Sequence, residues 1–134
     1  MKKRLLVLGI VVVSGSASAA PPSTPQLLEK GKSTFATTCV PCHGEKGDGA
    51  GAAASALDPK PRNFADAFKN GYKVEAIFKT LNDGLPPSAM VSFSALPEED
   101  RWALSYYVLE LRKELEKGRA SAAPPAKAAT KKGK

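Results

Sequence analysis

Two cysteines and one histidine lie within five residues of one another in the segment CVPCHGEKGDGAG, residues 39–51. They are Cys39, Cys42 and His43, and the chain of 134 residues contains no other cysteine or histidine. A thiolate is a nucleophile and a metal ligand, and a neutral imidazole binds metals and moves protons. The spacing therefore points to a chemistry that uses both thiols and the imidazole together.

Two kinds of site fit this segment poorly. A dithiol redox site would use the Cys-x-x-Cys pair, because that spacing lowers the pKa of one thiol and permits disulfide exchange. Such pairs usually belong to a thioredoxin-like βαβ unit, whereas this pair follows a predicted helix in a chain without strand alternation. A closed zinc site takes about four Cys or His ligands, and this segment offers three that cannot surround a metal well. Neither site is favoured.

Covalent attachment of haem uses all three side chains. Two thiols at this spacing can add to the two vinyl groups on one edge of haem, and the residue that follows can give the iron a nitrogen ligand. Cys-x-x-Cys-His is the sequence signature of this attachment. The sequence therefore predicts one haem c, attached through Cys39 and Cys42, with His43 as an axial ligand of its iron.

The second axial ligand of a six-coordinate electron-transfer haem would be a methionine or another histidine. The chain has no other histidine, and of its two methionines Met1 would leave with a signal peptide. Met90 lies 47 residues beyond His43, in a stretch that Pro86 and Pro87 keep free of helix. Packing in the core is the commoner role of methionine, but for a haem protein we predict that Met90 binds the iron.

Helices are predicted on both sides of the attachment segment. Thr24 is the expected N-cap of a first helix, with Pro25 at its first position, and this helix should end near Cys39. A loop rich in Gly, Ala and Pro follows, from residue 44 to about residue 62. A connection of that length is usually functional, and here it suggests a chain wrapped around something other than protein.

The second half of the chain predicts two further helices. A short one is expected from Val74 to Leu81, stopped by the sequence NDG at 82–84. The segment 85–96 should be extended. The strongest helix pattern is PEEDRWALSYYVLELRKELEKG, which has acidic residues at its start, basic residues near its end and Gly118 as the expected C-cap.

The two ends of the chain differ from its middle. Residues 1–19 are predicted to be a cleaved signal peptide, with a basic start, a nine-residue apolar core and the cleavage motif Ala-Ser-Ala. That apolar core is much shorter than the ~20 residues of a membrane-spanning helix. Residues 119–134 are predicted to be a disordered basic tail rich in Ala, Pro and Lys. The expected domain is therefore residues 20–118.

Positive charge is concentrated in the tail. The whole chain has a formal net charge of +7, but residues 20–116 contain 11 basic and 13 acidic residues, while six basic residues and no acidic ones follow. The predicted domain has no basic surface interleaved with aromatic residues, so we do not expect it to bind nucleic acid. Any contact with a membrane would have to use the tail.

The segments CVPCHGEKGDGAG, PKPRNF, NDG, AMVSF and PEEDRWALSYYVLEL together resemble the single-haem class I cytochrome c family of the bacterial type. The resemblance covers about residues 25–116. It implies a small all-α cytochrome c fold, with three to four helices wrapped around one covalently attached haem. It also implies thioether bonds at Cys39 and Cys42, and His43 and Met90 as the proximal and distal iron ligands. The chain departs from the usual pattern at Pro97, where a Ser or Thr cap is often found.

The resemblance also implies roles for residues around the site. A proline carbonyl would accept a hydrogen bond from the second ring nitrogen of the proximal histidine and orient the ring, and Pro59 and Pro61 are both candidates. Arg62 and Asn63 would bond to the haem propionates, or be a solvated arginine and a turn asparagine. Trp102 would reach a propionate through its ring N–H or, in the favoured role, lie in the core.

A close crossing of the first and last helices is the remaining implication. In the family these helices meet near a glycine and aromatic residues. Gly31 and Phe35 match on the first helix, and Leu104 and Tyr107 match on the last. A glycine permits this approach because it has no Cβ.

The expected function is electron transfer in the periplasm, as part of a respiratory chain, by a monomer that is not an enzyme. Its expected partners are an electron donor and an electron acceptor, bound through small transient contacts. Two alternatives stay open. One is a haem c subunit of a larger respiratory or oxidoreductase complex. The other is a five-coordinate haem sensor or enzyme in which Met90 does not bind the iron.

Overall fold

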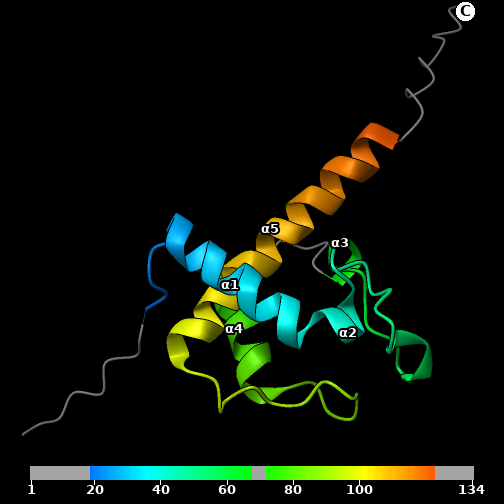
Figure 1. The fold of residues 1–134 in the computed structure, drawn as a ribbon, viewed down its shortest axis with the longest axis horizontal. Helices are drawn as coiled ribbons and strands as arrows, with labels where there is room; N and C mark the ends of the chain where they lie inside the picture. The colour runs from blue at the N-terminus through cyan, green and yellow to red at the C-terminus, as the bar shows by residue number, and fades with distance from the viewer. Residues whose placement is uncertain (1–18, 68–71, 123–134) are drawn as a thin grey trace, which may run out of the picture.

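The computed structural model describes residues 19–67 and 72–122 (Figure 1). Its elements are, in chain order, α1 (Pro25–Thr38), α2 (Val40–His43), the 3₁₀ turn η1 (Ala54–Ala56), α3 (Phe64–Ala67), α4 (Val74–Asp83) and α5 (Glu98–Ala122). No strand occurs within the two described ranges. The all-α prediction is confirmed: α1, α4 and α5 are longer helices, and α2 and α3 are single turns of four residues.

Helix α1 begins and ends where the sequence predicts. The hydroxyl oxygen of Thr24 accepts a hydrogen bond from the backbone N–H of Leu27 at 3.1 Å, and Pro25 lies in the first turn. This arrangement satisfies one of the helix's free N–H groups. At the other end, the N–H of Cys39 donates to the carbonyl of Phe35 at 2.8 Å. The first cysteine therefore lies directly at the C-terminal end of α1.

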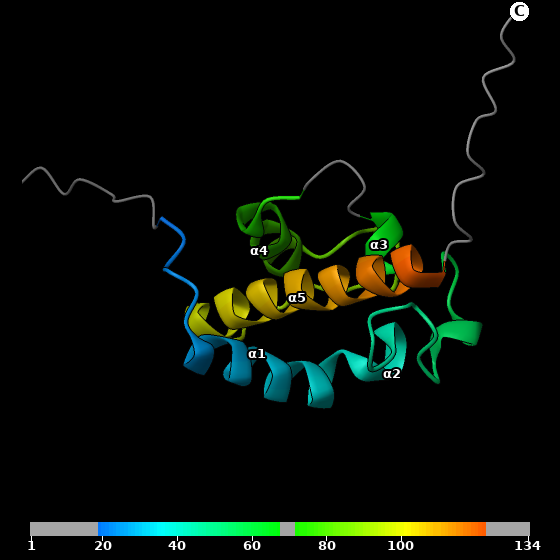
Figure 2. The ribbon, with the colours of Figure 1, turned by 90° about the horizontal axis from the view of Figure 1, so that it is seen from above.

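Helix α5 runs through the middle of the fold, with α1 on one side and α3 and α4 on the other (Figure 2). Its first turn contains three acidic residues, which favour the positive end of the helix dipole. In the described part of the chain, no helix is long and apolar enough to cross a membrane.

The predicted end of this last helix at Gly118 is wrong, because α5 continues to Ala122. Residues 119–122 form one more helical turn. In it, Arg119 donates two hydrogen bonds, each 2.9 Å long, to the carboxylate of Asp66 in α3. The first four residues of the predicted disordered tail, 119–122, are therefore helical. Residues 123–134 lie outside the described ranges, as do residues 1–18 of the predicted signal peptide.

Helices α1 and α5 approach closely at Gly31. A Cβ atom built on Gly31 would lie 2.2 Å from the carbonyl oxygen of Ala103 and 2.9 Å from the Cβ of Tyr107. Next to this point the rings of Phe35 and Tyr107 meet edge to face, with their centroids 5.4 Å apart. Leu104 is 1% exposed and belongs to the same core cluster as Phe35. The sequence predicted Leu104 and Tyr107 at this crossing, but not the approach of Gly31 to the backbone of Ala103.

Helix α4 positions the segment that follows it. The helix is two residues longer than predicted and buries Ile77 and Leu81. It ends at Gly84, which has a φ of +72°. A Cβ at Gly84 would lie 2.7 Å from the carbonyl oxygen of Met90, so this position favours glycine for its backbone angle and for the close approach. The chain then forms turns without helix up to the start of α5.

Candidate functional site

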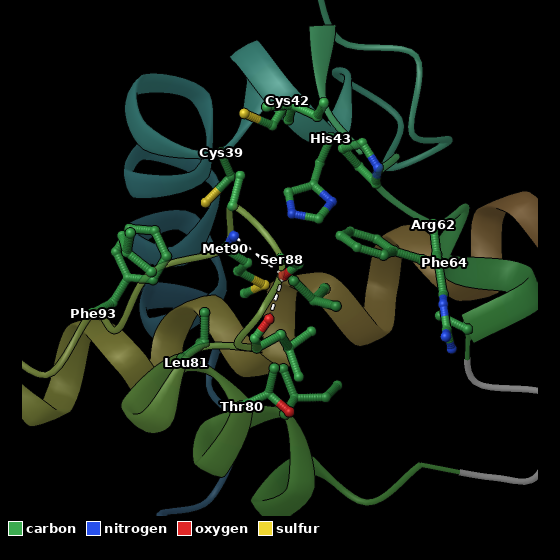
Figure 3. Close-up of a pocket in the computed structure, with 18 of the residues that line it drawn as sticks. Cys39, Cys42, His43, Arg62, Phe64, Thr80, Leu81, Ser88, Met90 and Phe93 are labelled. Atoms are coloured by element: carbon green, nitrogen blue, oxygen red, sulfur yellow. Dashed lines mark hydrogen bonds between the residues drawn. The ribbon is translucent and has the colours of Figure 1, made fainter. Parts of the chain in front are cut away.

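Helix α2 and the residue before it present the two thiols and the imidazole to one cavity (Figure 3). Cys39 lies at the junction of α1 and α2, and His43 is the last residue of α2. The backbone N–H groups of Cys42 and His43 both donate to the carbonyl of Cys39, at 3.2 and 2.9 Å. This single turn folds the segment so that all three side chains line the same space.

The cavity has a volume of about 560 Å³, within the range of ~300–1,000 Å³ that is typical of cofactor sites. Helix α2 bounds it on one side, and the segment after α4 bounds it on another. In Figure 3 the side chains of His43 and Met90 both point into the cavity, from these two elements. Most of the remaining lining is apolar and includes Phe35, Ile77, Leu81, Phe93 and Val108. The cavity therefore suits a large and mostly apolar ligand.

Neither thiol is used within the protein. Cys39 and Cys42 are half-buried and form no disulfide. Burial and, to a smaller degree, the nearby Cys42 raise the pKa of the Cys39 thiol from 9.0 to about 11. That thiol is protonated at neutral pH, whereas disulfide exchange needs a thiolate. In the described ranges no three His, Cys, Asp or Glu side chains are grouped as a metal ion would require. The raised pKa of Cys39 is opposite in direction to the lowered thiol pKa that is typical of a reactive dithiol site.

The imidazole of His43 is in the form that binds metals. Burial lowers its pKa and so favours the neutral ring, which has a free electron pair. Its Nδ1 atom is buried and has no hydrogen-bond partner among the described residues. Pro59 and Pro61 both line the cavity, but neither carbonyl bonds to this nitrogen in the structure. The assignment of a proline partner to His43 therefore stays a prediction.

Phe64, which was not among the predicted site residues, packs against the His43 ring. Phe64 is the first residue of α3 and is 6% exposed. Its ring centroid lies 5.1 Å from that of His43 and 6.2 Å from that of Phe35. The signal for it was a single aromatic residue in PKPRNF, after a long loop of small residues. Such a ring has to be buried against something, and here it packs behind the imidazole.

Met90 is half-buried and lines the cavity. Its backbone carbonyl accepts a hydrogen bond from the N–H of Leu85 at 2.9 Å, and its own N–H donates to the hydroxyl of Ser88 at 3.3 Å. The side chain also packs against the core cluster. Iron binding by Met90 stays a prediction, and the local turn explains how the chain directs this side chain into the cavity.

The other predicted site residues have different surroundings. Arg62 is exposed and lines the cavity. Asn63 does not line it, and its side-chain oxygen accepts a hydrogen bond from the N–H of Ala65 at 2.9 Å, which caps α3. Trp102 is 4% exposed, donates its ring N–H to Glu98 at 3.2 Å and stacks on Phe78. These contacts favour the turn role for Asn63 and the core role for Trp102.

The residues around the cavity fit a covalently bound haem. Cys39 and Cys42 would hold its edge, and His43 and Met90 would provide a nitrogen and a sulfur to its iron. Arg62 would be available to its propionates, since a guanidinium pairs well with carboxylates. A metal-bound histidine usually donates a hydrogen bond from its other ring nitrogen, and the buried, unpartnered Nδ1 of His43 would be available for this. The roles of these four residues toward a haem stay predictions, and the cavity has room for them to act together.

Comparisons with known proteins agree with this site. The family model described as Cytochrome c matches residues 28–112. No curated protein matches. Among the solved structures that match is the reducing HAO-like protein complex Kustc0457/Kustc0458 of Kuenenia stuttgartiensis, with a TM-score of 0.58 and 31% sequence identity. The match covers 66% of this chain and 44% of that chain, so this chain spans less than half the length of the one it matches.

Proposed function

Since the chain belongs to the cytochrome c family, we propose that it is an electron carrier that moves single electrons between redox proteins. Proteins of this family bind haem c covalently, and a single haem suits a domain of this size. When bound, this group supplies an iron that changes between two oxidation states. The observation that carries the proposal is that Cys39, Cys42, His43 and Met90 all line one apolar cavity.

The protein's side chains would have separate roles in this function. The thiols of Cys39 and Cys42 anchor the cofactor, so it cannot dissociate. His43 from α2 and Met90 from the segment after α4 would both bind the iron, which would keep small substrates from the metal. The apolar lining excludes water and, together with the axial sulfur, sets the redox potential. This arrangement suits a carrier and not an enzyme.

We also propose that the protein is exported to the periplasm. Export is typical of bacterial proteins of this family, and residues 1–19 have the pattern of a cleaved signal peptide. Sequencing the N-terminus of the purified protein should find Ala20 as the first residue. A purified haem protein that still begins at Met1 would contradict cleavage.

Covalent attachment can be tested directly on the purified protein. The mass should exceed that of the polypeptide by one haem, no thiol should react with a thiol reagent, and acidified acetone should leave the colour with the protein. Changing either Cys39 or Cys42 to Ala should greatly reduce the yield of coloured protein, because a thioether is lost. Haem that acetone extracts from the wild type, or two reactive thiols, would overturn the proposal.

A second candidate function is that of a haem c subunit in a larger complex. The observation that favours it is the likeness to a chain of the HAO-like complex. A free carrier should elute as a monomer from gel filtration of a periplasmic extract at native abundance, and its contacts with donor and acceptor should be transient. Stable co-elution with an oxidoreductase would favour the subunit role instead.

A further inference from the structure

The segment Leu85–Leu96, here called the Met90 segment, packs against the core only through the partly buried side chains of Met90, Phe93 and Leu96. It contains no helix, and two of its apolar side chains, Leu85 and Val91, are 50% and 66% exposed. A segment with few buried contacts opens more readily than the helices around it. Polar contacts therefore add to this partial apolar packing in holding Met90 at the cavity.

Hydrogen bonds attach the Met90 segment to the end of α4. The N–H of Phe93 donates to the carbonyl of Leu81 at 2.8 Å, and the hydroxyl of Ser92 donates to the carbonyl of Asn82 at 2.5 Å. The carbonyls at the C-terminal end of a helix lack partners within the helix. The segment therefore uses the free end of α4 as its attachment point.

Arg101 joins this attachment to the central helix. It belongs to α5, and its Nη1 atom donates to the side-chain oxygen of Asn82 at 3.0 Å and to the carbonyl of Ser94 at 3.0 Å. One guanidinium nitrogen thus links α5, the end of α4 and the Met90 segment. Hydrogen bonds from a charged donor are stronger than those between neutral groups.

The guanidinium of Arg101 is itself held in place. Its central carbon lies 5.2 Å from the centroid of the Phe78 ring, within the distance of a cation–π contact. Phe78 stacks on the buried Trp102, with centroids 3.9 Å apart. Two rings from α4 and α5 thus form a platform under the arginine, and this platform restricts where Nη1 can point.

We propose that Arg101 is a positioning residue that holds the Met90 segment against α4 and so keeps Met90 directed into the cavity. The consequence for the iron rests on the proposed function, in which Met90 is the axial ligand. Without the Arg101 hydrogen bonds, a larger fraction of the molecules has the Met90 segment detached from α4. In those molecules the iron would lack its sulfur ligand. The attachment itself does not depend on what Met90 binds.

The test compares Arg101→Leu with Arg112→Leu in the holoprotein. Leucine keeps an apolar contact with Phe78 and removes the donors. Arg112 is a matched control, since it lies on the same helix, lies outside the cavity lining, and bonds to Glu116 at 2.8 and 3.0 Å. Two quantities are measured: hydrogen exchange of the Phe93 amide, and the rate at which cyanide binds the ferric protein.

Arg101→Leu should increase both rates about tenfold, the factor that corresponds to about 1.4 kcal/mol. Arg112→Leu should leave both near the wild-type values. Arg101→Lys should give intermediate rates, because one ammonium keeps the charge over Phe78 but lacks the planar fork. Equal exchange rates in Arg101→Leu and Arg112→Leu would overturn the proposal.

A second variant covers a failure of Arg101→Leu to fold. Asn82→Ala removes one acceptor of the same arginine, so it should also speed both processes. If both variants fold, their combination should be less than additive, because they break a shared hydrogen bond. Full additivity would mean that the two residues act separately and would count against the proposal.

Adding Met90→Ala to the cyanide measurement tests the iron ligand separately from the role of Arg101. If the wild type binds cyanide as fast as Met90→Ala does, Met90 is not the axial ligand and that part of the proposed function fails. The Phe93 exchange rates still decide whether Arg101 holds the segment.

Discussion

Replacing Gly31 with alanine tests the close approach of α1 and α5. The added Cβ would lie 2.2 Å from the carbonyl oxygen and 2.6 Å from the carbonyl carbon of Ala103, and 2.9 Å from the Cβ of Tyr107. Ordinary contact begins near 3.4 Å, so the helices would have to separate locally by more than an ångström. The opposing atoms are backbone or directly attached to it, so no flexible side-chain end can move aside to relieve the clash.

The expected destabilisation is the difference between two effects. Overpacking of a well-packed site costs about 1–3 kcal/mol, and a clash with backbone belongs at the upper end of that range. Alanine in place of glycine in a helix returns about 1 kcal/mol. The net loss should therefore be about 2 kcal/mol, which lowers the melting temperature of a domain of this size by roughly 8–16 °C.

Far-ultraviolet circular dichroism of the holoprotein, followed during heating, measures this loss. Gly118→Ala is the matched control, because Gly118 is also helical but nothing lies within 4 Å of its added Cβ. The control should melt at the wild-type temperature or slightly above it, since it keeps the propensity gain without a clash. If Gly31→Ala is as stable as Gly118→Ala, the two helices do not approach as closely as the structure shows.

Three further predictions concern the ligand, the pH dependence and the tail. Met90→Ala should keep its haem, bind carbon monoxide readily and show a lower redox potential in a potentiometric titration; an unchanged potential would assign Met90 to packing alone. Burial, with a smaller effect of Glu29, raises the pKa of Tyr107 above 10.0; the folded state therefore binds this proton more tightly, and stability should fall as the pH rises above 10. Tyr107→Phe keeps the ring, and its free energy of unfolding in urea should fall less over that pH range. The same fall in both proteins would contradict the pKa shift. Deleting residues 123–134, which contain four lysines and no acidic residue, should slow electron transfer to an anionic partner at low salt but not at high salt; equal rates at low salt would leave the tail without a steering role.

The chemistry of the attachment segment was determined by the sequence alone, because it depends on residues that are neighbours in the chain. Cys39, Cys42 and His43 lie within five residues, so a single turn brings them together. In the structure all three line one cavity. The ends of α1 and the glycine that ends α4 were predictable for the same reason, since caps are local hydrogen bonds. Met90 was predicted as the second iron ligand by elimination, as one of two methionines in the whole chain, and that role stays a prediction.

Tertiary structure decided the features that depend on contacts between distant residues. The end of α5 was predicted at Gly118, but an ion pair between Arg119 and Asp66, 53 residues apart, accompanies its continuation. The arginine that links α4 to the Met90 segment carries no sequence signal, because its acceptors lie 19 and 7 positions away and one of them is a backbone carbonyl. Local patterns report the preferences of neighbouring residues, whereas these bonds form only after the helices have packed. The folded chain therefore had to show which polar side chains meet, although the sequence already contained the residues for the chemistry.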